Sequence, residues 1–124
     1  RQMCIRDRGM PPSLSVCNTD SLAEQLQSEF PEAHIVKGLN TMTSVVMVNP
    51  ALIPGEHNVF LSGNDEGAKL QVQHLLSEMG WKENMVIDLG DISTARGSEM
   101  LLPIWLRLWG SLGTAEFNFQ VARK

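Results

Sequence analysis

The stretch HNVFLSGNDEGAKLQVQHLLSEMGWKENMVIDL, residues 57–89, carries the pattern from which we predict the fold. HNVFLSG is typical of a buried strand closed by Gly63, and MVIDL of another strand that ends at Gly90. Between them, Asn64 or Asp65 caps a helix that stops at Gly80. Its apolar residues lie on one side of the helix, at Ala68, Val72, Leu75, Leu76 and Met79. A strand, a helix and a strand in succession indicate an α/β layered sheet.

The flanking sequence adds further elements to this unit. Ser21 and Glu24 have the spacing of a capping box, and the helix that they begin stops at Pro31. A buried strand follows from Ile35 to Leu39, and then a helix of one or two turns over residues 44–48. Near the end, FNFQVAR (117–123) alternates apolar and polar residues, which predicts a half-buried strand.

The segment from Glu99 to Trp109 is apolar on nearly every side. Such a helix is either buried on most sides or packed on a partner. Pro103 should bend it or mark a restart. Its methionines and tryptophans are either core residues or a flat apolar wall for a cofactor.

Composition narrows the classes of function. The 124 residues suffice for one domain, and the net charge of −4 gives no reason to expect nucleic acid or an anionic membrane as partner. Two cysteines make no disulfide framework, and the three histidines lack metal-ligand spacing, so we expect no metal site. Without a signal segment or a span-length apolar run, the chain is expected to be cytoplasmic.

The first eight residues, RQMCIRDR, resemble translated sequencing-adapter sequence. The natural chain would then resume near Gly9, with its true start lost. The alternative is a disordered polar N-terminus. We therefore leave residues 1–8 out of the fold and treat residues 9–124 as one domain.

Ligands of open α/β sheets bind beyond the carboxyl ends of strands, where three loops qualify. Asn40, in the first loop, can donate and accept, so it could hold an amide such as a nicotinamide carboxamide; alternatively Asn40 and Thr41 cap the next helix. The second loop, SGNDEG, lacks a lysine for phosphate and is predicted to be a helix cap. In the third, residues 90–99, Arg96 suits a carboxylate or phosphate, or pairs with Glu99 within the helix.

Four pieces of the sequence resemble the C-terminal part of the coenzyme F420-dependent NADP oxidoreductase family. They are VKGLNTM, VFLSGNDEGAKLQVQHLLSEMGW, DLGDISTARGSEMLLPIWLRLWGSLGT and FNFQV, within residues 9–123. The most specific are the strand ending in Asn-Thr and the pattern D-x-G-x-x-x-x-x-R-x-x-E from Asp88 to Glu99.

The resemblance implies the C-terminal portion of a Rossmann-like NADP-binding fold with a small helical and strand extension. It implies hydride transfer between NADP(H) and coenzyme F420 or a similar flat acceptor, in a protein that we expect to be a homodimer when intact. Asn40, Thr41 and Met42 would face the nicotinamide, and the acceptor side would be lined by Gly90, Ser93, Arg96 and Glu99. The sequence has no G-x-G-x-x-G, so we expect this truncated chain to be inactive alone.

Two alternatives stay open. One is a reductase of the same architecture that acts on a small imine, a ketone or a flavin-bound metal. The other is a non-enzymatic interaction domain that dimerises through its apolar helix.

Overall fold

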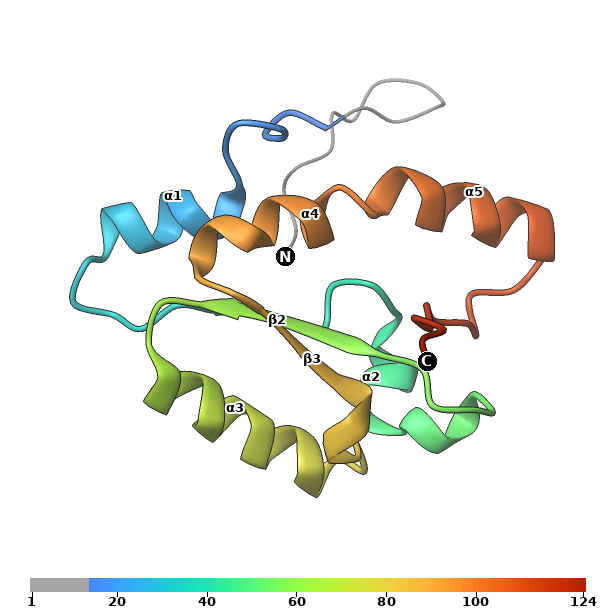
Figure 1. Cartoon of the computed structure of the whole chain (residues 1–124). Coiled ribbons are helices and arrows are strands. Elements are labelled where there is room, and N and C mark those ends of the chain that lie inside the picture. The colour runs from blue at the N-terminus through green and yellow to red at the C-terminus, as the bar shows by residue number, and fades with distance from the viewer. Residues whose placement is uncertain (1–13) are drawn as a thin grey trace.

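The computed structural model describes residues 14–124, so the predictions for residues 1–8 lie outside the described part. A three-stranded sheet in the order β1-β2-β3 forms the middle layer. Helices α1, α4 and α5 lie on one side of it and α3 on the other (Figure 1). The predicted α/β layered fold is confirmed.

The predicted strand–helix–strand unit is present. Strand β2 (Val59–Gly63) pairs in parallel with β3 (Val86–Gly90), and α3 (Glu66–Glu78) connects them, followed by a 3-10 helix (Glu83–Met85). Asp65 caps α3, because its Oδ2 accepts from the Ala68 N–H at 2.7 Å. Gly80 has a φ of +106°, the left-handed conformation that favours glycine after a helix.

Strand β1 is shorter than predicted and runs antiparallel to β2. Only Val36–Lys37 join the sheet, antiparallel to β2, with Val36 opposite Gly63 and Lys37 opposite Ser62. The prediction of a strand from Ile35 to Leu39 is therefore too long. Leu39 has a φ of +59°, which an L-residue rarely adopts and which turns the chain out of the sheet. The carboxyl end of β1 thus lies toward the amino end of β2.

Short helices surround this sheet. The predicted capping box begins α1 (Leu22–Glu29): Ser21 Oγ accepts from the Glu24 N–H at 3.1 Å. The helix expected over residues 44–48 is α2 (Ser44–Val48), followed by a 3-10 helix (Pro50–Leu52). After β3 come a 3-10 helix (Ile92–Thr94), α4 (Ala95–Glu99) and α5 (Leu102–Leu112).

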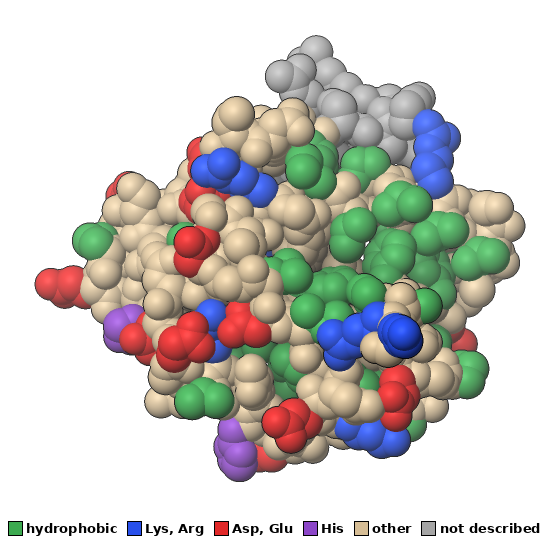
Figure 2. Space-filling model, in the orientation of Figure 1, with side chains coloured by type: hydrophobic (Ala, Val, Ile, Leu, Met, Phe, Trp, Pro, Cys, Tyr) green, Lys and Arg blue, Asp and Glu red, His purple; other side chains and the backbone are tan. Residues whose placement is uncertain are grey.

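Pro103 marks a restart, as predicted, because α4 ends at Glu99 and α5 begins at Leu102. The alternative in which this helix is buried on most sides is wrong for the described residues. No residue of α5 is buried, and Trp109 and Leu112 are 50% and 57% exposed. Hydrophobic side chains gather over α5 in Figure 2. No helix in the described part of the chain is long and apolar enough to cross a membrane.

The segment from Phe117 to Arg123 is not the predicted strand. It is held beside β2 instead. The Asn58 N–H donates to the Phe119 carbonyl at 2.9 Å, and the Val121 N–H donates to the Asn58 side chain at 2.7 Å. A side chain thus takes the place of a backbone partner, which stops a regular ladder from forming.

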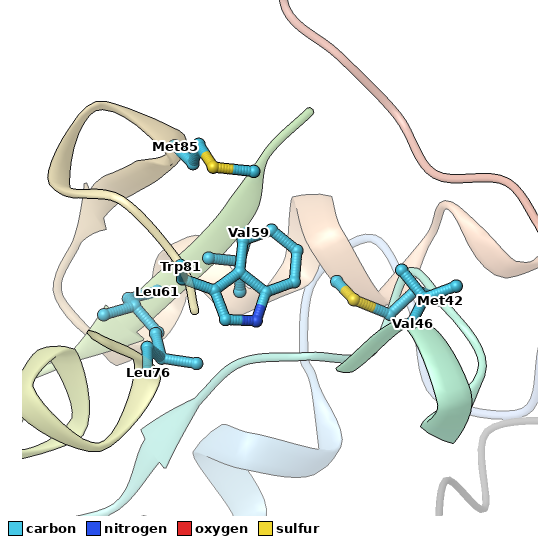
Figure 3. Packing of buried hydrophobic residues seen from close by; sticks show 7 residues of the cluster. All are labelled: Met42, Val46, Val59, Leu61, Leu76, Trp81 and Met85. Carbon is cyan, nitrogen blue, oxygen red and sulfur yellow. The ribbon is translucent and has the colours of Figure 1, made fainter. Parts of the chain in front are cut away.

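The core centres on Trp81, which packs among residues from α2, α3 and β2 (Figure 3). The other buried members of this cluster are Met42, Val46, Val59, Leu61, Leu76 and Met85. Trp81 is 2% exposed, and its indole N–H donates to the Met47 carbonyl at 2.9 Å. This bond satisfies the buried donor and orients the ring.

Candidate functional site

The Asn40–Met42 segment, predicted to face a cofactor, is joined to α4 by a hydrogen bond. The Asn40 amide Nδ2 donates to the Ser98 carbonyl at 2.8 Å. Neither Asn40 nor Thr41 caps α2, whose N-cap residue is Thr43. The structure thus gives these two side chains a role other than the helix cap considered as the alternative.

The side-chain oxygen of Asn40, Oδ1, is unusual. It is buried and has no hydrogen-bond partner among the described residues. A buried acceptor without a partner costs roughly 1–3 kcal/mol. Since Ser98 fixes the amide nitrogen, this oxygen is the atom of Asn40 that could accept an N–H from a bound molecule.

Thr41 and Met42 are more deeply placed. Thr41 is 3% exposed, and its Oγ1 donates to the Asn118 Oδ1 at 3.0 Å. Met42 is 6% exposed and belongs to the hydrophobic core, against Val46 (Figure 3). Its side chain therefore contributes mainly to packing in this structure.

Asn118 continues a hydrogen-bond chain from Thr41 into the interior. Its Nδ2 lies 2.8 Å from the His57 Nδ1 and donates to the Asn58 carbonyl at 2.9 Å. The other ring nitrogen of His57 lies 2.8 Å from the Pro50 carbonyl, and the ring is 1% exposed. Sequence reasoning missed Asn118 and His57 as parts of the site. The one available signal was a polar residue between Phe117 and Phe119.

Gly90 and Ser93 lie at the carboxyl end of β3. Gly90 has a φ of +121° and its carbonyl accepts from the Lys69 Nζ at 3.1 Å. Ser93 binds Asp91 with both its N–H and its hydroxyl, and these bonds lower the Asp91 pKa. Ser93 is therefore engaged in shaping its own turn.

Lys69 is a buried cation that the sequence did not reveal. It is 2% exposed, and its Nζ lies 3.0 Å from both Glu66 and Asp88. Burial by itself would lower the Lys69 pKa, but the hydrogen bonds to Glu66 and Asp88 outweigh it and raise that pKa. The ammonium group thus fastens α3 to the end of β3.

Arg96 binds a carboxylate of its own chain. Its Nε and Nη2 donate to the two oxygens of Glu24 at 2.9 and 2.7 Å. This two-point contact lowers the Glu24 pKa and raises the Arg96 pKa. The pairing joins α4 to α1, and an anionic ligand at Arg96 would compete with Glu24.

Glu99 is buried and connects three elements. It is 5% exposed, its two oxygens accept from the N–H groups of Leu22 and Ala23 at 2.8 and 3.1 Å, and Oε1 lies 3.2 Å from the Lys37 Nζ. The carboxylate therefore caps the positive end of α1 and faces a cation on β1.

The two predicted groups of site residues lie toward opposite ends of β2. Thr41 connects through Asn118 to Asn58, just before β2, whereas Gly90 pairs with Ser62 near its end. The antiparallel direction of β1 causes this separation. The third loop reaches the Asn40 region only through its last part, where Ser98 meets Asn40.

Trp105 is the centre of an aromatic cluster in the segment for which either core residues or an apolar cofactor wall was predicted. Its ring centroid lies 5.7 Å from that of Trp109 and 5.2 Å from that of Phe117. The Trp105 indole N–H is also buried without a partner among the described residues. Within residues 14–124, no group of three or more His, Cys, Asp or Glu side chains is placed to hold a metal ion.

Comparison with solved structures finds a protein that is similar to this chain over nearly its whole length. A crystal structure from Arthrobacter sp. FB24, described as a "putative F420 dependent NADP-reductase", has 57% sequence identity to this chain and a TM-score of 0.91. The match covers 97% of this chain and 54% of the crystallised one, so the chain spans about half the length of that relative. No family model and no curated protein matches the chain.

Proposed function

The chain resembles the F420-dependent NADP oxidoreductase family over nearly its whole length, and from this premise we propose that it forms part of an NADP(H)-dependent oxidoreductase. The proposed reaction is NADPH + H⁺ + F420 → NADP⁺ + reduced F420. Two electrons and one hydrogen leave the nicotinamide ring together as hydride, and a proton from solvent completes the reduction of the deazaflavin. The observation that carries the proposal is the 57% identity to the Arthrobacter protein.

The cofactor supplies the hydride, and the protein supplies position and dryness. In this proposal Asn40 and Thr41 hold the nicotinamide side. The unpartnered Asn40 Oδ1 fits this role, because a carboxamide N–H would satisfy it. The bond from Asn40 to the Ser98 carbonyl would keep that oxygen pointing toward the ligand. Met42 supports the segment from the core beneath it.

For the acceptor side we keep Gly90, Ser93, Arg96 and Glu99 as the proposed residues, with Gly90 and Ser93 as supporting residues because they lie toward the other end of β2 from Asn40. Their geometry favours support over direct contact for Arg96 and Glu99, since each binds a partner within the chain. The apolar cluster of Trp105, Trp109 and Phe117 is the surface on which a flat ring could stack. We further propose that the protein is a cytoplasmic homodimer.

One observation favours the second candidate, an interaction domain. Helix α5 exposes Ile104, Trp109 and Leu112 by 49%, 50% and 57%, and such apolar clusters commonly mark contact surfaces. The two candidates are compatible if α5 forms the dimer contact of the enzyme. A measurement of NADPH oxidation distinguishes the oxidoreductase from a non-enzymatic interaction domain.

The test uses a hybrid reductase, in which this chain is joined to the remaining part of the Arthrobacter relative. We expect the hybrid to oxidise NADPH when F420 is present, with the loss of F420's visible absorbance. Oxidation of NADPH with a small imine or ketone, and none with F420, would favour the alternative reductase. A folded hybrid that binds NADPH and reduces none of these acceptors would contradict an enzymatic role.

Asn40→Ala in the hybrid provides the residue-level test. We expect turnover to fall about tenfold to a hundredfold, the effect of losing roughly 1–3 kcal/mol of orienting interaction, while NADPH affinity changes little. Turnover within twofold of the parent would show that Asn40 is not part of the site.

A further inference from the structure

The hydrogen-bond chain behind Thr41 has only one consistent direction. The Asn58 carbonyl can only accept, so the group of Asn118 that lies 2.9 Å from it must be the amide nitrogen. Turning the amide over would bring two oxygens together at that point. The orientation of Asn118 is therefore fixed by the backbone of the residue that precedes β2.

The same logic fixes the hydrogen of His57. The Pro50 carbonyl can only accept, so the His57 Nε2 that lies 2.8 Å away must carry a proton. In the neutral ring Nδ1 is then an acceptor, which suits the second N–H of Asn118 at 2.8 Å. Both N–H groups of Asn118 are thus used by Asn58 and His57.

The consequence reaches Thr41. With its nitrogen turned inward, Asn118 presents its oxygen to Thr41, and the Thr41 hydroxyl must donate across the 3.0 Å contact. Because Thr41 is 3% exposed, its hydroxyl has no ready alternative in bulk water. Residue 118 therefore anchors residue 41, which lies far away in the sequence.

Asn40, next to Thr41, is fixed from the other side by the Ser98 carbonyl. The segment is thus held at two points, and the Asn40 Oδ1 is left as an acceptor without a partner among the described residues. We infer that Asn118 is a positioning residue, which holds the Asn40–Thr41 segment so that the Asn40 Oδ1 meets the ligand as an acceptor of an amide N–H.

This inference rests on the proposed function and refines it. It assigns the amino group of the nicotinamide carboxamide to the Asn40 Oδ1. An analogue in which the carboxamide is replaced by an acetyl group keeps the carbonyl but has no N–H. We expect the parent hybrid to use NADPH at least about tenfold better than the reduced acetylpyridine analogue, and Asn40→Leu to lose most of that preference.

The hydrogen-bond chain is tested first in the 124-residue chain, without any cofactor. Nitrogen NMR of the imidazole should find His57 with its proton on Nε2. Asn118→Asp places a carboxylate beside Nδ1, so that nitrogen should take up a proton from solvent while Nε2 keeps its own proton for the Pro50 carbonyl. A parent His57 protonated on Nδ1 alone would overturn the assigned chain, whatever the protein does.

The positioning role is tested in the hybrid by a double-mutant cycle. Asn118→Ala and Thr41→Val should each lower turnover about tenfold, with the KM for NADPH within about threefold. The double variant should be no worse than either single variant, because both remove the same contact. Thr41→Ser keeps the hydroxyl and should retain most of the activity, and the exposed neighbour variant Gln120→Ala should match the parent.

Losses that multiply in the double variant would assign Asn118 a general structural role and overturn the inference. If Asn118→Ala fails to fold, the near-isosteric variant Thr41→Val is used instead. Its preference for NADPH over the reduced acetylpyridine analogue and its turnover are then compared with those of the parent hybrid. If both are unchanged, the inference is overturned. A folded parent hybrid without F420 reduction would instead refute the proposed function, and with it this role of Asn118, while His57 NMR still decides the hydrogen-bond chain.

Discussion

Replacing Glu99 with glutamine should lower the free energy of unfolding by about 3 kcal/mol or more. The Glu99 and Lys37 side chains are only 2% and 8% exposed, and the charged atoms lie 3.2 Å apart. At an effective dielectric constant of about 20, the gross attraction at that distance is about 5 kcal/mol. Glutamine keeps one oxygen for the N–H groups of α1 but no negative charge for the buried ammonium group.

Two variants serve as controls for Glu99→Gln. Lys37→Met should cost less, because the remaining carboxylate still accepts from Leu22 and Ala23 at the positive end of α1. Glu78→Gln removes an exposed partner of His74 on α3 and should change stability by less than about 0.5 kcal/mol. Urea unfolding, monitored by tryptophan fluorescence, measures the free energy of unfolding of all three variants. A Glu99→Gln effect as small as that of Glu78→Gln would refute the reasoning.

Four further outcomes follow from the structure. Trp81→Phe leaves the part-buried Met47 carbonyl without its donor and should cost roughly 1–3 kcal/mol in urea unfolding. Arg96 lowers the Glu24 pKa, so this pair stabilises the fold above the ordinary glutamate pKa. That stability should be lost as the pH falls through the lowered pKa of Glu24. The free energy of unfolding of Glu24→Gln should not fall in this pH range. The chain alone should bind NADPH weakly, since its sequence has no glycine-rich phosphate loop; micromolar affinity by fluorescence titration would contradict this. Trp109→Glu should reduce self-association in sedimentation experiments, and an unchanged association state would exclude this face of α5.

Local signals in the sequence predicted the local structure well. The capping residues Ser21 and Asp65 and the stop at Gly80 act within a few residues of themselves, so their positions could be read directly. The restart at Pro103 has the same origin. Each of these features depends on backbone geometry or on a bond that spans at most three or four residues.

Contacts between distant residues were the part that the sequence could not supply. The antiparallel direction of β1 depends on its pairing with residues near Gly63, and no local pattern specifies it. The partner of Arg96 is Glu24 and not its helical neighbour, because folding brings α1 beside α4. The tail around Phe119 has strand-like alternation, but the partners that the chain offers there prevent a ladder.

The same limit applied to the site. Asn40 and Thr41 were proposed from their place after a strand and from the resemblance to a family, and their role stays a prediction. The support from Asn118 and His57 joins residues that are far apart in sequence, and it became visible only in three dimensions.

Transfer of deuterium tests the proposed hydride transfer most directly. NADPH carrying deuterium at the transferred position of its nicotinamide ring would be mixed with F420 and the hybrid reductase, and the reduced F420 would be analysed by mass spectrometry. We predict one deuterium in each molecule of reduced F420, at a rate that falls about tenfold or more in Asn40→Ala. Reduced F420 without the label, or no reduction by a folded hybrid that binds NADPH, would contradict hydride transfer between these two cofactors.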